Sequence, residues 1–142
     1  MKGTKTFALL LALLLALTMT LSLATTAFAA ETYTITITND KTGHTYEAYQ
    51  IFAGDLTEKD GNKILSNITW GSGVTDEGKT ALGDAAEKAA SLKNEADAKA
   101  FAEEVAKYLD STKAITSGAQ SEGKYTISGL SAGYYLVKDK DN

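Results

Sequence analysis

Residues 32–38 decide the fold, and their sequence is Thr-Tyr-Thr-Ile-Thr-Ile-Thr. In an extended chain, Tyr33, Ile35 and Ile37 fall on one face and four threonines fall on the other. Strict alternation of this kind in β-branched and aromatic residues is typical of a strand that buries one face. The sequence therefore predicts a half-buried strand over these residues.

Five later segments also have the composition of strands, because each is short, rich in β-branched or aromatic residues and bounded by turn-forming residues. They are residues 45–53, 63–70, 114–116, 124–128 and 134–139. Residues 39–43 are predicted to form a turn, and the charged residues 55–62 are predicted to form a loop. The pattern as a whole predicts a mainly β, antiparallel domain.

Residues 75–109 interrupt the strands with a stretch rich in Ala, Glu and Lys. Asn94 is a suitable N-cap, with Asp97 at the third helical position. Beyond it, apolar residues recur at steps of three and four, as on the buried face of a helix. A second, weaker helix is predicted over residues 79–93. We therefore expect a two-helix insertion between strands.

The first 29 residues have the three zones of a secretory signal peptide. Lys2 and Lys5 give a positive start, residues 7–17 are uninterruptedly apolar, and Ala27-Phe28-Ala29 fits the small-x-small cleavage pattern. The alternative is a membrane anchor, but residues 7–23 are at the lower length limit for a span and no positive cluster follows. We predict export, with cleavage between Ala29 and Ala30.

The mature domain is thus expected to span residues 30–142. Its last residues, Lys-Asp-Lys-Asp-Asn, directly follow a strong strand pattern. We therefore expect the domain to continue beyond Asn142.

The composition of the 142-residue chain excludes several functional classes. It has 14 Lys, no Arg, 18 acidic residues, one His, no Cys and no Pro. Without Cys there is no disulfide, thiolate nucleophile or Cys-ligated metal. Past residue 30, 12 Lys stand against 18 acids, a net charge of −6. An acidic, Arg-free domain is poorly suited to phosphate backbones, so we expect no nucleic-acid partner.

Residues 73–80, Gly-Val-Thr-Asp-Glu-Gly-Lys-Thr, satisfy the phosphate-loop pattern G-x4-G-K-[ST]. That pattern works by pointing backbone N–H groups at a phosphate. Asp76 and Glu77 would place two negative charges in the anion site, and export removes the domain from nucleoside triphosphates. We therefore expect no nucleotide binding.

Residues 129–133 match the G-x-S-x-G pattern of a nucleophile elbow, with Ser131 as its serine. The pattern requires a strand-to-helix turn followed by an acid and then a His, but residues 134–139 are predicted to be a strand. The chain's one His, His44, lies upstream in a turn, where we expect an exposed polar residue. A Gly-rich hairpin turn is the favoured interpretation, and we expect no enzyme activity.

A calcium loop around residues 58–61 is equally unsupported. Leu56 occupies the position of the first Asp ligand, and Asn67 occupies that of the bidentate Glu. We expect neither a metal nor an organic cofactor.

Four stretches resemble a known protein family. They are YTITITN (33–39), GHTYEAYQIF (43–52), LSNITWGSGV (65–74) and GLSAGYYLVKD (129–139). Together they are similar to the N-terminal domain of sortase-assembled major pilins of Gram-positive bacteria, the isopeptide-forming fimbrial shaft proteins. The resemblance covers nearly all of the mature chain, and the second and fourth stretches are its most specific parts.

The resemblance implies an immunoglobulin-like (CnaB-like) β-sandwich and a role as a structural subunit of a covalently polymerised pilus at the cell wall. Its partners would be a sortase and other pilin subunits. In this family the linking Lys lies in a Tyr-Pro-Lys-type motif, and the sorting signal is of the Leu-Pro-x-Thr-Gly type. Both motifs contain Pro, which this chain lacks. We therefore assign no linking Lys. The alternative is a wall-anchored adhesin or minor pilin that binds a host ligand, with residues 78–109 as its variable surface.

In related domains, a Lys on the first strand reacts with an Asn or Asp side chain, assisted by a buried acid. The resemblance places Asp139 at that acid position, in the strand Gly-Tyr-Tyr-Leu-Val-Lys-Asp. The predicted first strand has no Lys, however, the nearest being Lys41. A solvated acid at a strand end is the favoured interpretation of Asp139.

Overall fold

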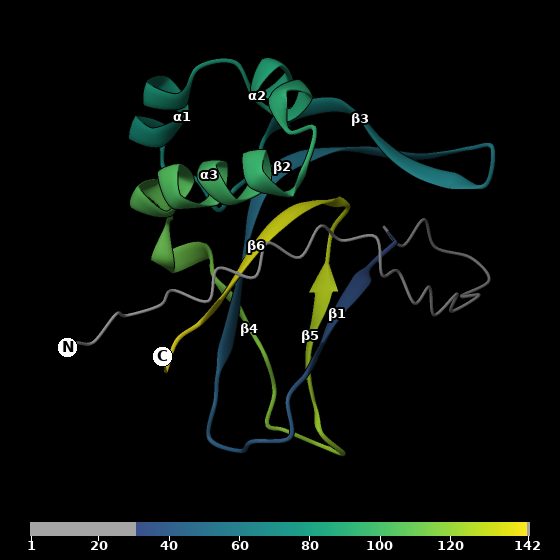
Figure 1. The fold of residues 1–142 in the computed structure, drawn as a ribbon, viewed down its shortest axis with the longest axis vertical. Helices are drawn as coiled ribbons and strands as arrows, with labels where there is room; N and C mark the ends of the chain where they lie inside the picture. Colours follow the sequence, from purple (N-terminus) through teal and green to yellow (C-terminus); the bar gives the residue numbers. More distant parts are fainter. Residues whose placement is uncertain (1–30, 142) are drawn as a thin grey trace.

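The structure is a computed structural model that describes residues 31–141. Six strands lie in this part of the chain: β1 (Tyr33–Thr38), β2 (Tyr46–Lys59), β3 (Asn62–Trp70), β4 (Ile115–Thr116), β5 (Lys124–Leu130) and β6 (Gly133–Asp139). Between β3 and β4 come the helices α1 (Asp76–Leu82), α2 (Ala85–Ser91) and α3 (Glu95–Val105) and the 3-10 turns η1 (Ala106–Tyr108) and η2 (Ser111–Lys113). The helices gather at one end of the strands (Figure 1).

The strands form two antiparallel sheets. In the larger sheet, β2 pairs with β6 on one side and with β3 and β4 on the other. The smaller sheet consists of β1 and β5. The prediction of a mainly β, antiparallel fold is therefore confirmed, and all six predicted strands are present with shifted ends.

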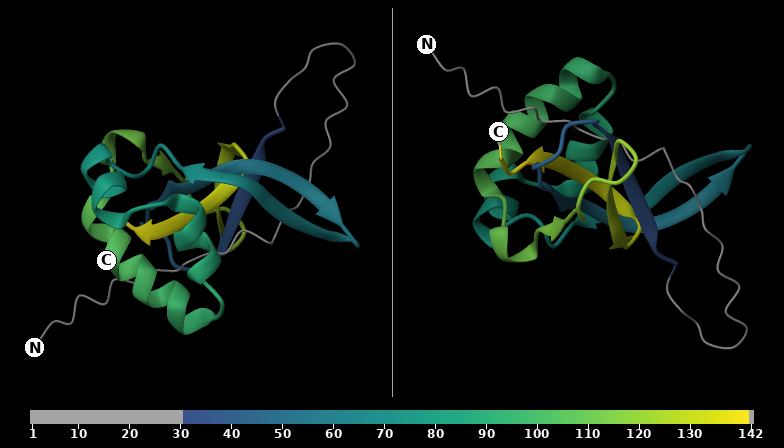
Figure 2. Two further views of the ribbon diagram at one scale, coloured as in Figure 1. Left: turned by 90° about the horizontal axis from the view of Figure 1, so that it is seen from above. Right: turned by 90° about the horizontal axis from the view of Figure 1, so that it is seen from below.

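Residues 55–62 are not a loop, which corrects the sequence-based prediction. β2 continues to Lys59, and β3 begins at Asn62, directly opposite it in the register. The two residues between them, Asp60 and Gly61, have φ values of 53° and 77°. Asp-Gly with two positive φ angles is a favoured two-residue hairpin turn, so the charged residues can stay in strands. The hairpin projects away from the body of the molecule (Figure 2).

Three α-helices replace the two that were predicted. Gly83, at a φ of 87°, ends α1, and the Asp84 side chain then accepts a hydrogen bond from the backbone N–H of Glu87 to begin α2. The prediction for α3 is confirmed, because the Asn94 side chain accepts from the N–H of Asp97. The helix break at residue 83 follows from the tolerance of Gly for positive φ.

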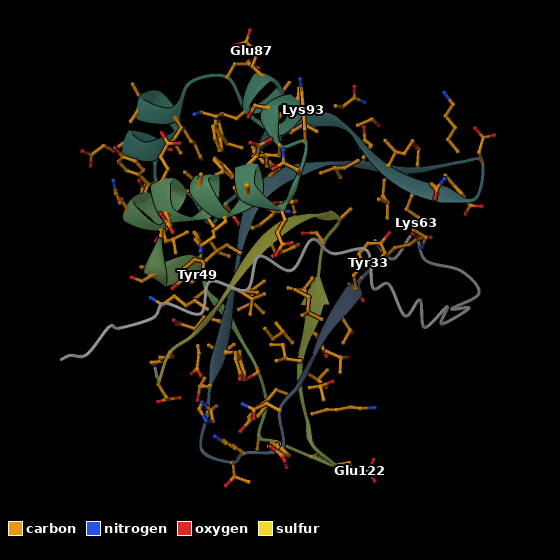
Figure 3. The ribbon with its side chains drawn as sticks, in the orientation of Figure 1. Tyr33, Tyr49, Lys63, Glu87, Lys93 and Glu122 are labelled. Carbon is orange, nitrogen blue, oxygen red and sulfur yellow. The ribbon has the colours of Figure 1, made fainter. Side chains whose placement is uncertain are left out.

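Two apolar clusters form the core. The first fills the space between the larger sheet and the helices, and Phe52 lies at its centre in ring contact with Trp70, Phe101 and Tyr134. The second lies between the two sheets and includes Ile35. Figure 3 shows the side chains of the two layers, with Glu87 and Glu122 marking opposite ends of the molecule.

Candidate functional site

The most specific family-like stretches lie side by side in the fold. GHTYEAYQIF supplies the first half of β2, GLSAGYYLVKD supplies β6, and the two strands pair antiparallel from Tyr46 opposite Asp139 to Ala53 opposite Gly133. Ile51 is an extra residue in β2, because the register shifts between Gln50 and Phe52. This bulge turns neighbouring residues of β2 toward the helical layer.

The side chains of Asp139 and His44 are hydrogen-bonded to each other at the end of this strand pair, opposite the helices. The distance from His44 Nδ1 to Asp139 Oδ2 is 2.7 Å, and the side chains are 26% and 6% exposed. The backbone N–H of Asp141 donates to the other carboxylate oxygen at 2.9 Å. The favoured interpretations of both residues are therefore wrong: the Asp139 side chain is largely covered rather than solvated, and the His44 side chain is partly buried beside it.

Two tyrosine rings surround His44. Its ring stacks on Tyr46 at 6.2 Å, and Tyr125 meets it edge-on at 6.4 Å. The Tyr125 hydroxyl accepts from the backbone N–H of His44 and donates to the carbonyl of Lys41. These contacts tie the β1–β2 loop to β5 and β6, which fixes the imidazole against the carboxylate.

Within the described part of the chain, this pair joins the β1–β2 loop to the end of β6. Both hydrogen-bond partners of the Asp139 carboxylate there, His44 and the N–H of Asp141, are donors, and neither is a Lys amine or an Asn amide. The side-chain amide of Asn39, directly after β1, donates to the Tyr46 hydroxyl at 2.8 Å. The role of Asp139 as an isopeptide-promoting acid stays a prediction.

The phosphate-loop match is explained by packing. A Cβ on Gly73 would lie 2.7 Å from the backbone N and O of Gln50, and one on Gly78 would lie 2.4 Å from Cβ of Tyr108. The N–H groups are also occupied: Gly73 donates to Gln50, Thr75 to Tyr108 and Gly78 to the Thr75 side chain. These glycines allow close approach, and their N–H groups are not available to a phosphate.

The G-x-S-x-G match has a similar explanation, although its turn is not a hairpin. β5 and β6 belong to different sheets, so residues 131–132 cross between sheets, which corrects the prediction. A Cβ on Gly133 would lie 2.5 Å from the Phe52 carbonyl oxygen. The Ser131 hydroxyl accepts from the Gln50 amide at 3.4 Å, while its carbonyl accepts from the Tyr135 hydroxyl at 2.7 Å. Ser131 thus shares no hydrogen bond with His44.

An open recess of about 370 Å³ lies beside Trp70, between β3 and the junction of α1 and α2. The Trp70 indole N–H donates to the carbonyl of Gly83 at 2.8 Å. Its wall also contains the polar side chains of Thr69, Lys79, Thr80 and Asp84. The recess combines an aromatic ring with hydroxyl, amine and carboxylate groups, and it forms only where the fold places α1 and α2 against β3.

Burial raises the pKa of Tyr134 to about 12. Its hydroxyl has no hydrogen-bond partner within residues 31–141. In the same range, no group of three or more His, Asp or Glu side chains is placed to hold a metal ion.

The predicted cleavage site at Ala29 and Ala30 lies outside the described residues. Within the described segment, no helix is both long enough and apolar enough to cross a bilayer. Comparisons of the chain with protein-family models, with curated proteins and with solved structures gave no match.

Proposed function

We propose that the chain is the N-terminal part of a structural subunit of a covalently polymerised pilus on a Gram-positive cell wall. One observation carries the proposal: the two most specific pilin-like stretches are neighbouring paired strands, β2 and β6, of the larger sheet. They contribute buried residues to both apolar clusters. Similarity concentrated in the core-forming strands supports a shared fold of immunoglobulin-like type, with the helices as an insertion.

The composition suits such a subunit. The mature chain has no disulfide to reduce and carries an acidic charge that favours solubility. Its stability rests on apolar burial, including Phe52, Tyr125 and Tyr135, each at most 1% exposed. The proposed subunit performs no turnover of its own, and the sortase supplies the chemistry of linkage.

The test is polymerisation of the full-length gene product. The precursor is produced in a Gram-positive host with and without its cognate sortase, and wall digests are separated in denaturing gels. We expect a ladder of covalent multimers only with the sortase. A product that remains a single wall-linked band in the presence of the sortase would contradict the shaft role.

The Trp70 recess favours a second candidate, a wall-anchored adhesin or minor pilin that binds a host ligand. Thr69→Arg would fill the recess, and Thr57→Arg on the projecting hairpin is a matched control, since both threonines are exposed strand residues. An adhesin would lose binding to host matrix components only with the first variant. Equal binding by both variants would contradict this use of the recess.

A further inference from the structure

The Trp70 side chain is fixed in place beside the recess between β3 and the junction of α1 and α2. Its ring stacks on that of Phe52 at 5.2 Å, with 28° between the planes, and its indole N–H donates to the carbonyl of Gly83 at 2.8 Å. Phe52 is only 1% exposed, so core packing holds it in position. Trp70 is half-buried and lines the recess. The recess therefore has a preorganised aromatic surface in its wall.

Hydrogen-bonding groups line the recess together with this ring. The Thr80 hydroxyl donates to the carbonyl of Asp76 at 3.1 Å, so its oxygen lone pairs can accept from a ligand. One Asp84 carboxylate oxygen accepts from the N–H of Glu87 at 2.9 Å, and the carboxylate keeps further acceptor capacity. The exposed Thr69 hydroxyl can donate as well as accept. The lining thus offers several hydrogen bonds beside an aromatic plane.

The charges at the recess nearly cancel, which disfavours charged ligands. The Lys79 amine lines the recess and lies 3.4 Å from the carboxylate of Asp76, and Asp84 adds a second carboxylate. A phosphate or sulfate group would meet two carboxylates and one amine. A quaternary ammonium group would meet the Lys79 charge and a single ring rather than an aromatic cage. The electrostatics therefore favour a neutral ligand.

The recess has the size and chemistry of a site for one sugar ring. Its volume of about 370 Å³ lies within the range of about 300–1,000 Å³ that is usual for small-molecule sites. A pyranose carries C–H groups on one face, which can pack on an aromatic plane, and hydroxyls around its edge, which both donate and accept. A purely apolar ligand would instead leave the polar groups of Thr80 and Asp84 without partners.

We propose that the recess beside Trp70 binds a neutral pyranose unit of a glycan. The C–H face of the sugar lies on the indole ring, and its hydroxyls bond to Thr69, Thr80 and Asp84. This inference rests on the second candidate function, because it names the class of ligand that the adhesin would bind. A single sugar unit has about a dozen non-hydrogen atoms, so we expect a Kd on the order of 1 mM.

Fluorine NMR of the full-length, signal-processed protein, labelled with 5-fluorotryptophan, tests the site directly. Trp70 is the one Trp among the 142 residues, and Trp70→Phe assigns its signal. The probes are the methyl glycosides of glucose, galactose, mannose, N-acetylglucosamine and N-acetylgalactosamine, each titrated to about 50 mM, with glycerol as the control. We expect at least one glycoside to shift the Trp70 signal saturably, and glycerol to leave it unchanged. No saturable shift with any glycoside would overturn the proposal.

Matched variants locate the binding site. Thr69→Arg fills the recess, and Thr57→Arg on the projecting hairpin is its control. We expect the first variant to weaken glycoside binding at least about 10-fold and the second to leave it unchanged. Asp84→Asn keeps a capping residue but removes the charge, and we expect it to weaken binding several-fold relative to Glu103→Gln, an exposed acid on α3. Thermal unfolding verifies that each variant is folded. Equal binding by Thr69→Arg and Thr57→Arg would overturn the proposal.

The ligand class and the proposed function can fail separately. Tighter binding of glucose 6-phosphate or galacturonate than of every neutral glycoside would overturn the assignment to a neutral sugar. Glycoside binding in solution without adhesion of cells that depends on Thr69 would support the sugar site and contradict the adhesin role alone. Adhesion that depends on Thr69 without any response to glycosides would overturn the sugar site alone. The sortase ladders test neither.

Discussion

At the scale of single residues, the contact between His44 and Asp139 joins two points that are 95 positions apart in sequence. The pair has a nearly buried carboxylate on one side and two tyrosine rings around the imidazole. Such a pair stabilises the fold when both partners are present, and removal of one leaves a buried polar group unsatisfied.

We expect Asp139→Ala to lower the free energy of unfolding by about 1–3 kcal/mol and to couple strongly to His44→Ala in a double-mutant cycle. The control is Asp76→Ala with Lys79→Ala, since Asp76 is fully exposed and lies 3.4 Å from the Lys79 amine. The cycle is measured by chemical denaturation. A coupling energy no larger than that of the exposed control pair would contradict the stabilising role.

Tyr134→Phe removes a buried hydroxyl without a described partner, so we expect stability at pH 8 to stay equal or to rise by up to about 1 kcal/mol. The pKa of Tyr134 is raised from 10.0 to about 12 by burial. The neutral form is therefore favoured by folding, and its contribution is present below pH 10 and lost as the pH rises toward 12. Denaturation at pH 8 and at a pH approaching 12 should show that the variant loses less free energy of unfolding at the higher pH than the parent protein does. Clear destabilisation at pH 8 would mean that the hydroxyl has a partner.

At the scale of elements, strand patterns were predictable from sequence, because alternation in residues 32–38 and apolar segments such as 134–139 report burial directly. The α3 helix was equally predictable from Asn94 and its apolar spacing. The β2–β3 hairpin was not predictable, because the charged residues near its tip have the composition of a loop. The turn itself needs only two residues, Asp60 and Gly61. The break at Gly83 is not predictable from the sequence, because Ala-rich sequence continues across it.

We expect Gly73→Ala to destabilise the protein by at least about 1–3 kcal/mol, because the added methyl group would overlap the backbone of Gln50. Gly118→Ala is the matched control, as its Cβ would meet nothing within 4 Å. Thermal unfolding of both variants measures the difference. Equal stability of the two variants would show that Gly73 is not constrained by packing, and would reopen the phosphate-loop interpretation.

At the scale of the whole molecule, the sequence does not predict which strands share a sheet. Nothing in residues 129–133 indicates that the turn connects different sheets rather than adjacent strands. The same holds for the site. The family resemblance indicates Asp139, but its partner His44 lies in a loop whose position depends on the sheet register. The Trp70 recess likewise joins β3 to a helix junction.

We expect the exported protein to begin at Ala30, because signal peptidase accepts the small residues at positions 27 and 29. N-terminal sequencing of the secreted protein measures this, with Ala27→Leu as a variant that should slow cleavage. An intact Met1 on protein recovered from the cell surface would contradict the prediction of a cleaved signal.

We propose that this domain belongs to a covalent protein fibre. Mass spectrometry of proteolysed, high-mass wall material tests it most directly. We expect a branched peptide in which the carboxyl end of one subunit's sorting motif is joined to a Lys side chain of another copy, with residues 31–142 represented in the same material. Wall material that contains only linear peptides of this protein would contradict the claim.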